Sequence, residues 1–189
     1  KVCGMTDAGN IRDVEVLGVD MIGFIFYPKS PRYLYQIPRY LPTLAKRVGV
    51  FVNETKENIL MYVDRFGLNY VQLHGDESPE YCRTLHSQGI RIIKAFSIKT
   101  AEDIEKALQS PADYILLDQG GGGTGKTFDW SLIPEIQRPF FLAGGIGAAN
   151  LEQAIREIHP YAVDLSSSVE TEKWKDPTKI RQVVDSVRK

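Results

Sequence analysis

Short apolar runs rich in Val, Ile, Phe and Tyr recur along the chain, and their apolar residues do not alternate with polar ones. Such runs are typical of strands that are buried on both faces. Successive runs start about 24 residues apart, and Lys1–Cys3 supplies the end of one more. The pattern predicts strands at Asp20–Phe26, Val48–Val52, Tyr70–Leu73, Arg91–Phe96, Tyr114–Leu117, Phe140–Ala143 and Ala162–Leu165.

Helical periodicity fills the space between several of these runs. In 58–66 the side chains of Ile59, Val63 and Phe66 share one face, and 151–158 and 180–187 repeat this arrangement. Helix boundaries are marked as well. Ser78-Pro79 predicts a helix start, and Thr100 followed by Asp103 resembles a capping box. A glycine followed by an aliphatic residue predicts helix ends at Gly18, Gly67 and Gly89.

The order of these elements predicts the fold class. Strands that alternate with helices form parallel sheets, and eight strand–helix units favour a single (β/α)₈ barrel over residues 1–189. An open doubly wound sheet is the alternative. Such a sheet would place its phosphate-binding glycines after the first strand, whereas the richest glycine segments here come late in the chain.

Charge and composition exclude several classes of function. The 23 basic and 24 acidic side chains give a net charge of -1, so the chain has no electrostatic bias toward nucleic acid or membranes. No apolar stretch approaches the roughly 20 residues of a spanning helix. Two cysteines without metal-type spacing, and no visible signal peptide, lead us to expect a cytoplasmic protein. The chain begins inside a predicted strand, so we expect its first residues to be missing.

In a parallel barrel the active site forms where strands end and loops begin. Cys3 and Asp118 each end a predicted strand, so a thiol and a carboxyl would face one substrate as base and acid. Each also has a plainer interpretation, because free cysteine is usually a small buried hydrophobe and such an aspartate often caps a loop. Asp164 has the same placement as Asp118, and His74 is interpreted as a rim histidine rather than a metal ligand.

Two further segments predict an anion site. Gly144-Gly145 and Ser166-Ser167-Ser168 follow the last two predicted strands, where barrels commonly bind phosphate through backbone N–H groups. Arg32 is a candidate for a second anion, although a solvated surface arginine is its default interpretation. Residues 120–127 also match the P-loop pattern, but little space remains for the full helix that should follow. We therefore interpret this segment as a loop that folds over a ligand.

Together these segments resemble the phosphoribosylanthranilate isomerase family. The resemblance covers the chain in order and rests on residues 1–4, 23–32, 48–53, 71–75, 116–118, 122–130, 143–145 and 163–167. It implies an Amadori rearrangement in tryptophan biosynthesis, in which N-(5-phosphoribosyl)anthranilate becomes 1-(2-carboxyphenylamino)-1-deoxyribulose 5-phosphate. It also implies a small-molecule phosphorylated substrate, no metal or organic cofactor, and a monomer or homodimer.

The resemblance assigns roles to individual residues. Cys3 would be the general base at sugar C2′, and Asp118 would be the general acid that protonates the ring oxygen. Arg32 would bind the anthranilate carboxylate, and Asp164 would orient the sugar. Backbone groups around Gly144, Gly145, Ser166 and Ser167 would bind the phosphate.

The chain departs from the family pattern at one position of the site. Ser168 stands where glycine is usual, which puts the backbone contact at 168 in doubt. The alternatives are another phosphate-binding barrel enzyme and a P-loop nucleotide-binding protein. A lysine-based synthase would need a rim lysine, and Lys94 is the candidate inside a strand.

Overall fold

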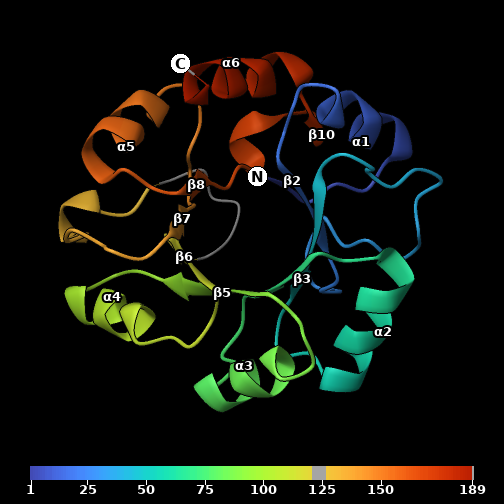
Figure 1. The fold of residues 1–189 in the computed structure, drawn as a ribbon. Coiled ribbons are helices and arrows are strands. Elements are labelled where there is room, and N and C mark those ends of the chain that lie inside the picture. Colours follow the sequence, from blue (N-terminus) through green and yellow to red (C-terminus); the bar gives the residue numbers. More distant parts are fainter. Residues whose placement is uncertain (121–126, 189) are drawn as a thin grey trace.

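A computed structural model describes residues 1–120 and 127–188 of the chain. Eight parallel strands form one sheet in sequence order (Figure 1). The sheet closes on itself through a parallel bridge between Val2 and Leu165, where the Cys3 amide donates to the Leu165 carbonyl at 2.8 Å. The barrel prediction is therefore confirmed. The strands are β1 Val2–Cys3, β2 Met21–Ile25, β3 Lys46–Phe51, β4 Tyr70–Leu73, β5 Ile92–Ser97, β6 Tyr114–Asp118, β7 Phe140–Leu142 and β8 Ala162–Val163.

Helices surround the barrel on the outside (Figure 1). Those that the structure describes are α1 Ala8–Glu15, α2 Lys56–Phe66, α3 Pro79–His86, α4 Ala101–Leu108, α5 Leu151–Ile158 and α6 Pro177–Val187. Two 3₁₀ helices, η1 Trp130–Leu132 and η2 Ser167–Val169, and a small hairpin of β9 Glu170–Thr171 with β10 Trp174–Lys175 complete the described elements. None of the helices in the described part of the chain is long and apolar enough to cross a membrane.

The regular alternation of strand and helix was wrong between β2 and β3. Residues 26–45, between β2 and β3, form turns and loops rather than a helix. This segment carries Pro28, Pro31, Pro38 and Pro42, and proline removes a helix hydrogen bond and clashes with the preceding turn. Between β6 and β7, the described residues contain only η1.

The predicted helix starts and the predicted end at Gly67 are confirmed, whereas α1 ends at Glu15 and α3 at His86, three residues before Gly18 and Gly89. The Ser78 hydroxyl accepts a hydrogen bond from the Tyr81 amide, and the Asp103 carboxylate accepts one from the Thr100 amide at 3.0 Å. Gly67 ends α2 in the left-handed conformation, with φ +57°. These local signals therefore mark the starts of α3 and α4 and the end of α2.

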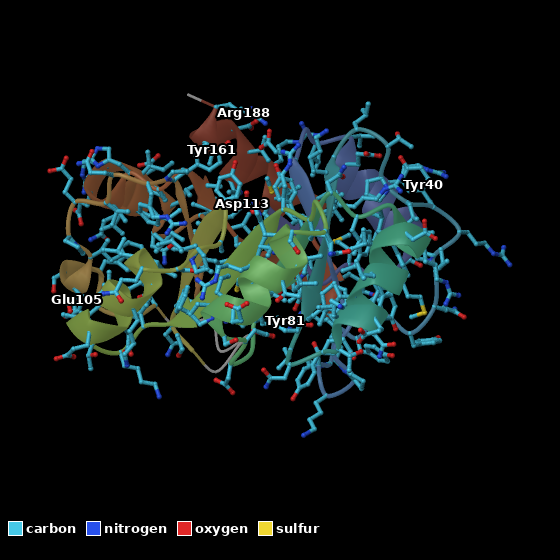
Figure 2. All side chains as sticks on the ribbon, turned by 60° about the horizontal axis from the view of Figure 1, so that its bottom comes forward. Tyr40, Tyr81, Glu105, Asp113, Tyr161 and Arg188 are labelled. Carbon is cyan, nitrogen blue, oxygen red and sulfur yellow. The ribbon has the colours of Figure 1, made fainter. Side chains whose placement is uncertain are left out.

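Alternating side chains divide the core into two layers, since successive residues of a strand point to opposite faces. One layer packs the strands against the surrounding helices. The other fills the inside of the barrel and consists of Val48, Tyr70, Ile93, Ala95, Leu116, Phe141 and Ala143. In Figure 2, Tyr161, just before β8, lies in the upper part of the view. Tyr81, whose hydroxyl donates to the Glu54 carbonyl in the loop after β3, lies below the middle. This inner layer does not fill the barrel at the carboxyl ends of the strands, where a cavity opens.

Candidate functional site

A cavity of about 890 Å³ opens at the carboxyl ends of the strands. Every site residue predicted from the sequence lines it: Cys3, Arg32, Asp118, Gly144, Gly145, Asp164, Ser166 and Ser167. His74 and Ser168 line it too. Residues that are distant in the sequence therefore meet in one space, as the barrel geometry predicts.

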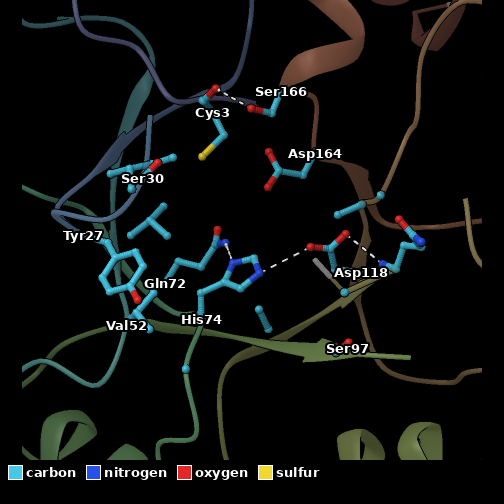
Figure 3. A pocket seen from close by; sticks show the side chains of 18 of the residues that line it. Cys3, Tyr27, Ser30, Val52, Gln72, His74, Ser97, Asp118, Asp164 and Ser166 are labelled. Carbon is cyan, nitrogen blue, oxygen red and sulfur yellow. Dashed lines mark hydrogen bonds and ion pairs between the residues drawn. The ribbon is translucent and has the colours of Figure 1, made fainter. Parts of the chain in front are cut away.

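Strand alternation explains why the reactive side chains face inward. Asp118 lies two residues beyond Leu116, which belongs to the inner core layer, so both point into the barrel. Cys3 and Asp118 are 6% and 8% exposed. In the view of Figure 3 they lie on opposite sides of the opening, with Asp164 between them. The thiol of Cys3 and the carboxyl of Asp118 thus face a shared cavity.

Asp118 is held by two contacts. Its Oδ1 accepts a hydrogen bond from the Gln119 amide at 2.8 Å, and its Oδ2 lies 3.3 Å from His74 Nε2. The other ring nitrogen of His74 lies 3.0 Å from Gln72 Nε2 (Figure 3). His74 is therefore a rim histidine that orients a carboxyl, in agreement with its interpretation from the sequence.

Gly144 is required beside Asp118 for a steric reason. A Cβ atom at this position would lie 2.9 Å from Asp118 Oδ1 and 2.8 Å from the Gln119 amide nitrogen. The residue also has φ +82°, a conformation that side chains disfavour. The Gly-Gly segment after β7 therefore serves the carboxyl of β6 as well as the predicted anion site.

Cys3 has a lysine as a close neighbour. Lys1 lies two residues earlier on the same side of its strand, and its Nζ contacts Asp164 Oδ2 at 2.7 Å. Burial raises the pKa of the Cys3 thiol, and the Lys1 ammonium opposes that rise. Burial alone would lower the pKa of Lys1, but Asp164 and Cys3 outweigh it and raise this pKa.

Arg32 is not a solvated surface arginine. Its Nε and Nη2 donate to the two carboxylate oxygens of Glu170 at 2.7 and 2.6 Å. Glu170 also accepts a hydrogen bond from Lys175 Nζ at 2.6 Å. Burial would raise the pKa of Glu170, but the two cations outweigh it and lower this pKa. A bidentate pair fixes the plane of the guanidinium group at the edge of the cavity.

The departure at Ser168 connects the two loops of the predicted anion site. The Ser168 hydroxyl donates to the Ile146 carbonyl, and Ser168 Cβ lies 3.2 Å from the position that a Cβ at Gly147 would take. The extra side chain thus packs against the loop after β7. Ser168 also remains part of the cavity lining.

Lys94 belongs to a different group of contacts. It lies between Ile93 and Ala95 of the inner layer, so its side chain points away from the barrel interior. Its Nζ contacts Glu77 Oε2 at 3.2 Å and donates to the Gly75 carbonyl at 2.7 Å. Glu77 in turn accepts a hydrogen bond from the Asn53 amide. The ion pair of Lys94 and Glu77 therefore stabilises the loop that follows His74.

Sequence reasoning missed the roles of Lys1, Gln72, Glu77, Glu170 and Lys175. Gln72 carried a usable signal, because it lies two residues before His74 on one strand and shares its inward face. Glu170 and Lys175 carried none, since they come from a hairpin that no hydrophobic pattern marks. The P-loop-like segment includes residues 121–126, which lie outside the described residues.

Comparison with known proteins adds a family to this geometry. The family model described as N-(5'phosphoribosyl)anthranilate (PRA) isomerase matches residues 1–186. A relative from Phocaeicola vulgatus named N-(5'-phosphoribosyl)anthranilate isomerase is 44% identical over 180 residues, which are 90% of this chain and 88% of the relative. The relative of the same name from Thermotoga neapolitana is 40% identical, over 100% of this chain and 97% of its own.

Solved structures agree. A phosphoribosyl anthranilate isomerase from Thermotoga maritima superposes with a TM-score of 0.88 at 39% identity, covering 99% of this chain and 97% of its own. A second isomerase structure superposes with a TM-score of 0.85 at 37% identity, covering 99% of this chain and 96% of its own. That structure holds reduced 1-(o-carboxyphenylamino)-1-deoxyribulose 5-phosphate.

Proposed function

Because the chain belongs to the N-(5'-phosphoribosyl)anthranilate isomerase family, we propose that Cys3 and Asp118 carry the proton transfers of its reaction. The enzyme catalyses the Amadori rearrangement of N-(5-phosphoribosyl)anthranilate in tryptophan biosynthesis. The observation that carries the assignment is that the Cys3 thiol and the Asp118 carboxyl line a single cavity. Both side chains are nearly buried, so water competes little with the substrate for their protons.

The rearrangement needs an acid first and a base second. The Asp118 O–H donates its proton to the furanose ring oxygen, the C1′–O bond breaks, and the nitrogen lone pair forms a protonated Schiff base at C1′. The iminium group acidifies the C2′–H bond. The Cys3 thiolate then takes the C2′ proton, and the C–H electrons form the C1′–C2′ double bond of an enolamine. Tautomerisation of this enolamine yields the ketose.

The rest of the cavity suits the two ends of the substrate. Glu170 binds the Nε and Nη2 atoms of Arg32, so a substrate carboxylate would meet the guanidinium edge that contains Nη1. We assign the anthranilate carboxylate to this edge. The phosphate is assigned to backbone groups of Gly144, Gly145, Ser166 and Ser167 at the ends of β7 and β8. Asp164, whose buried Oδ1 has no hydrogen-bond partner among the described residues, is assigned to a sugar hydroxyl.

Arg32→Ala should mainly raise KM and leave kcat close to wild type. A guanidinium that holds the carboxylate equally in ground and transition states contributes uniform binding. Steady-state kinetics of the purified variant check this. Arg39→Ala is the matched control, because Arg39 is an exposed arginine of the same loop that does not line the cavity. Equal KM values for the two variants would remove Arg32 from the substrate site.

The domain organisation, cellular location and partner of the enzyme are also proposed. We propose that residues 1–189 act as one barrel domain in the cytoplasm, as a monomer or homodimer. The balance of 23 basic against 24 acidic side chains supports a small-molecule substrate rather than nucleic acid or a membrane as the partner. One related structure is described as monomers generated from a dimeric isomerase, and size-exclusion chromatography with light scattering distinguishes the two states here.

A further inference from the structure

Lys1 lies inside the barrel, two residues before Cys3, the proposed base. The Lys1 side chain is 0% exposed, and its Nζ contacts Asp164 Oδ2 at 2.7 Å. Lys1 and Cys3 lie two residues apart on one strand, so their side chains share the inner face. The proton transfers described above do not use this ammonium group, and a buried charge is costly unless it is paired.

The neighbouring strand makes room for this arrangement. Gly23 of β2 pairs with Cys3 in the sheet. A Cβ atom on Gly23 would lie 2.8 Å from Cys3 Sγ and 3.2 Å from Lys1 Cε, so both side chains occupy the space that glycine leaves empty. The Lys1 charge also acts electrostatically on the Cys3 thiol. The Lys1 side chain therefore lies beside the sulfur atom, and its ammonium group contacts the Asp164 carboxylate.

The charges around the sulfur act in opposite directions. Lys1 from β1 and Lys175 from β10 favour a thiolate, while Asp164 after β8 opposes it. Arg32 also interacts electrostatically with Cys3, and Glu170 pairs with both Arg32 and Lys175. Lys1 is the largest of the opposing influences on Cys3 after burial itself. Its charge is therefore the one whose removal should change the thiol most.

We propose that Lys1 is a positioning residue for the base, whose ammonium group stabilises the Cys3 thiolate and holds its sulfur toward the cavity. The thiol proton leaves to solvent through the cavity, and the sulfur electron pair then accepts the C2′ proton of the substrate. Asp164 keeps the buried ammonium paired while Cys3 is neutral. The proposal rests on the assignment of Cys3 as the base, so its test must also read the thiol directly.

The direct test is the pH dependence of Cys3 alkylation by iodoacetamide. A Cys82→Ser background leaves Cys3 as the only thiol, since the chain has two cysteines. Lys1→Met keeps the aliphatic stem and removes the charge. It should slow alkylation at neutral pH by about tenfold or more and move the midpoint to higher pH. Lys1→Arg keeps the charge and should stay near the background protein.

Two further variants keep the test decisive if Lys1→Met fails to fold. Lys1→Gln keeps a polar group for Asp164 and should show the same upward movement of the midpoint. Asp164→Asn removes the opposing charge and should move the midpoint to lower pH. Superimposable alkylation profiles for the background protein and the uncharged Lys1 variants would overturn the proposal.

Kinetics separate this proposal from the assignment of Cys3 itself. If Lys1 acts through the thiolate, the loss of kcat/KM in Lys1→Met should shrink as pH rises, whereas a purely structural defect gives a loss that is independent of pH. An active Cys3→Ser variant would defeat the assignment of the base and leave the alkylation result standing. An inactive Cys3→Ser variant together with unchanged alkylation would defeat only the role of Lys1.

Discussion

Cys3→Ser and Asp118→Asn should each lower kcat by about 10²–10⁴-fold, because each removes a positioned base or acid while keeping the shape of the side chain. Serine cannot form an anion near neutral pH as a thiol can, and asparagine has no acid proton to give. Binding of a reduced product analogue should weaken far less than kcat falls. Steady-state kinetics combined with calorimetric binding measure the two effects separately.

Each of these variants has a control within the chain. Cys82 is buried on α3 in the outer core, away from the cavity, so Cys82→Ser should leave kcat and KM unchanged. Asp113 precedes β6 at its amino end, where its Oδ2 accepts a hydrogen bond from the Ile92 amide at 2.8 Å. Asp113→Asn should therefore spare catalysis. A Cys3→Ser variant with near-wild-type kcat would make Cys3 a packing residue.

The pH profile gives a second view of the same base. Burial raises the pKa of the Cys3 thiol, so the thiolate fraction of the free enzyme grows as pH rises toward and through that pKa. The wild-type kcat/KM should therefore increase with pH on its acidic side. This increase should be absent from any residual activity of Cys3→Ser.

Glu77→Gln should destabilise the protein by about 3–5 kcal/mol, which is the usual cost of removing one partner of a buried ion pair. The side chains of Lys94 and Glu77 are only 6% and 3% exposed. The change leaves the Lys94 ammonium buried without its counterion. For a chain of this length the loss corresponds to a fall in Tm of roughly 6–20 °C. Differential scanning calorimetry measures it.

An exposed pair supplies the control for this prediction. Arg83 Nε and Glu80 Oε2 lie 3.1 Å apart on α3 with both side chains exposed, so Glu80→Gln should change stability by no more than about 0.5 kcal/mol. The double variant Glu77→Gln/Lys94→Met should lose less than the sum of the single variants, because it removes both charges. Equal Tm values for Glu77→Gln and Glu80→Gln would show that the buried pair contributes nothing.

Much of the fold could be predicted because burial on both faces leaves a clear trace in the sequence. Tyr70–Leu73 is predicted and observed with the same bounds, and Tyr114–Leu117 differs by one residue. The missing helix between β2 and β3 was harder to foresee. Its prolines were visible, yet the regular spacing of the strands favoured a helix in this connection.

Some residues of the site could likewise be predicted from the sequence, and others could not. Residues at strand ends, such as Cys3, Asp118 and Asp164, could be found because parallel strands bring their carboxyl ends together. The residues that pair with these side chains could not be found in this way. Lys1 looks like the polar start of a strand, and only the register between β1, β2 and β8 reveals that it faces Cys3 and Asp164. Glu170 reaches Arg32 across 138 positions of sequence, a contact that no local pattern encodes.

The central claim is tested most directly by adding the purified protein to freshly prepared N-(5-phosphoribosyl)anthranilate and following the fluorescence of the anthranilate derivative. The account predicts a loss of fluorescence at a rate proportional to the concentration of protein. It also predicts that the Cys3→Ser variant leaves the signal near its spontaneous decay. A wild-type signal that decays at the same rate with and without protein would contradict the account.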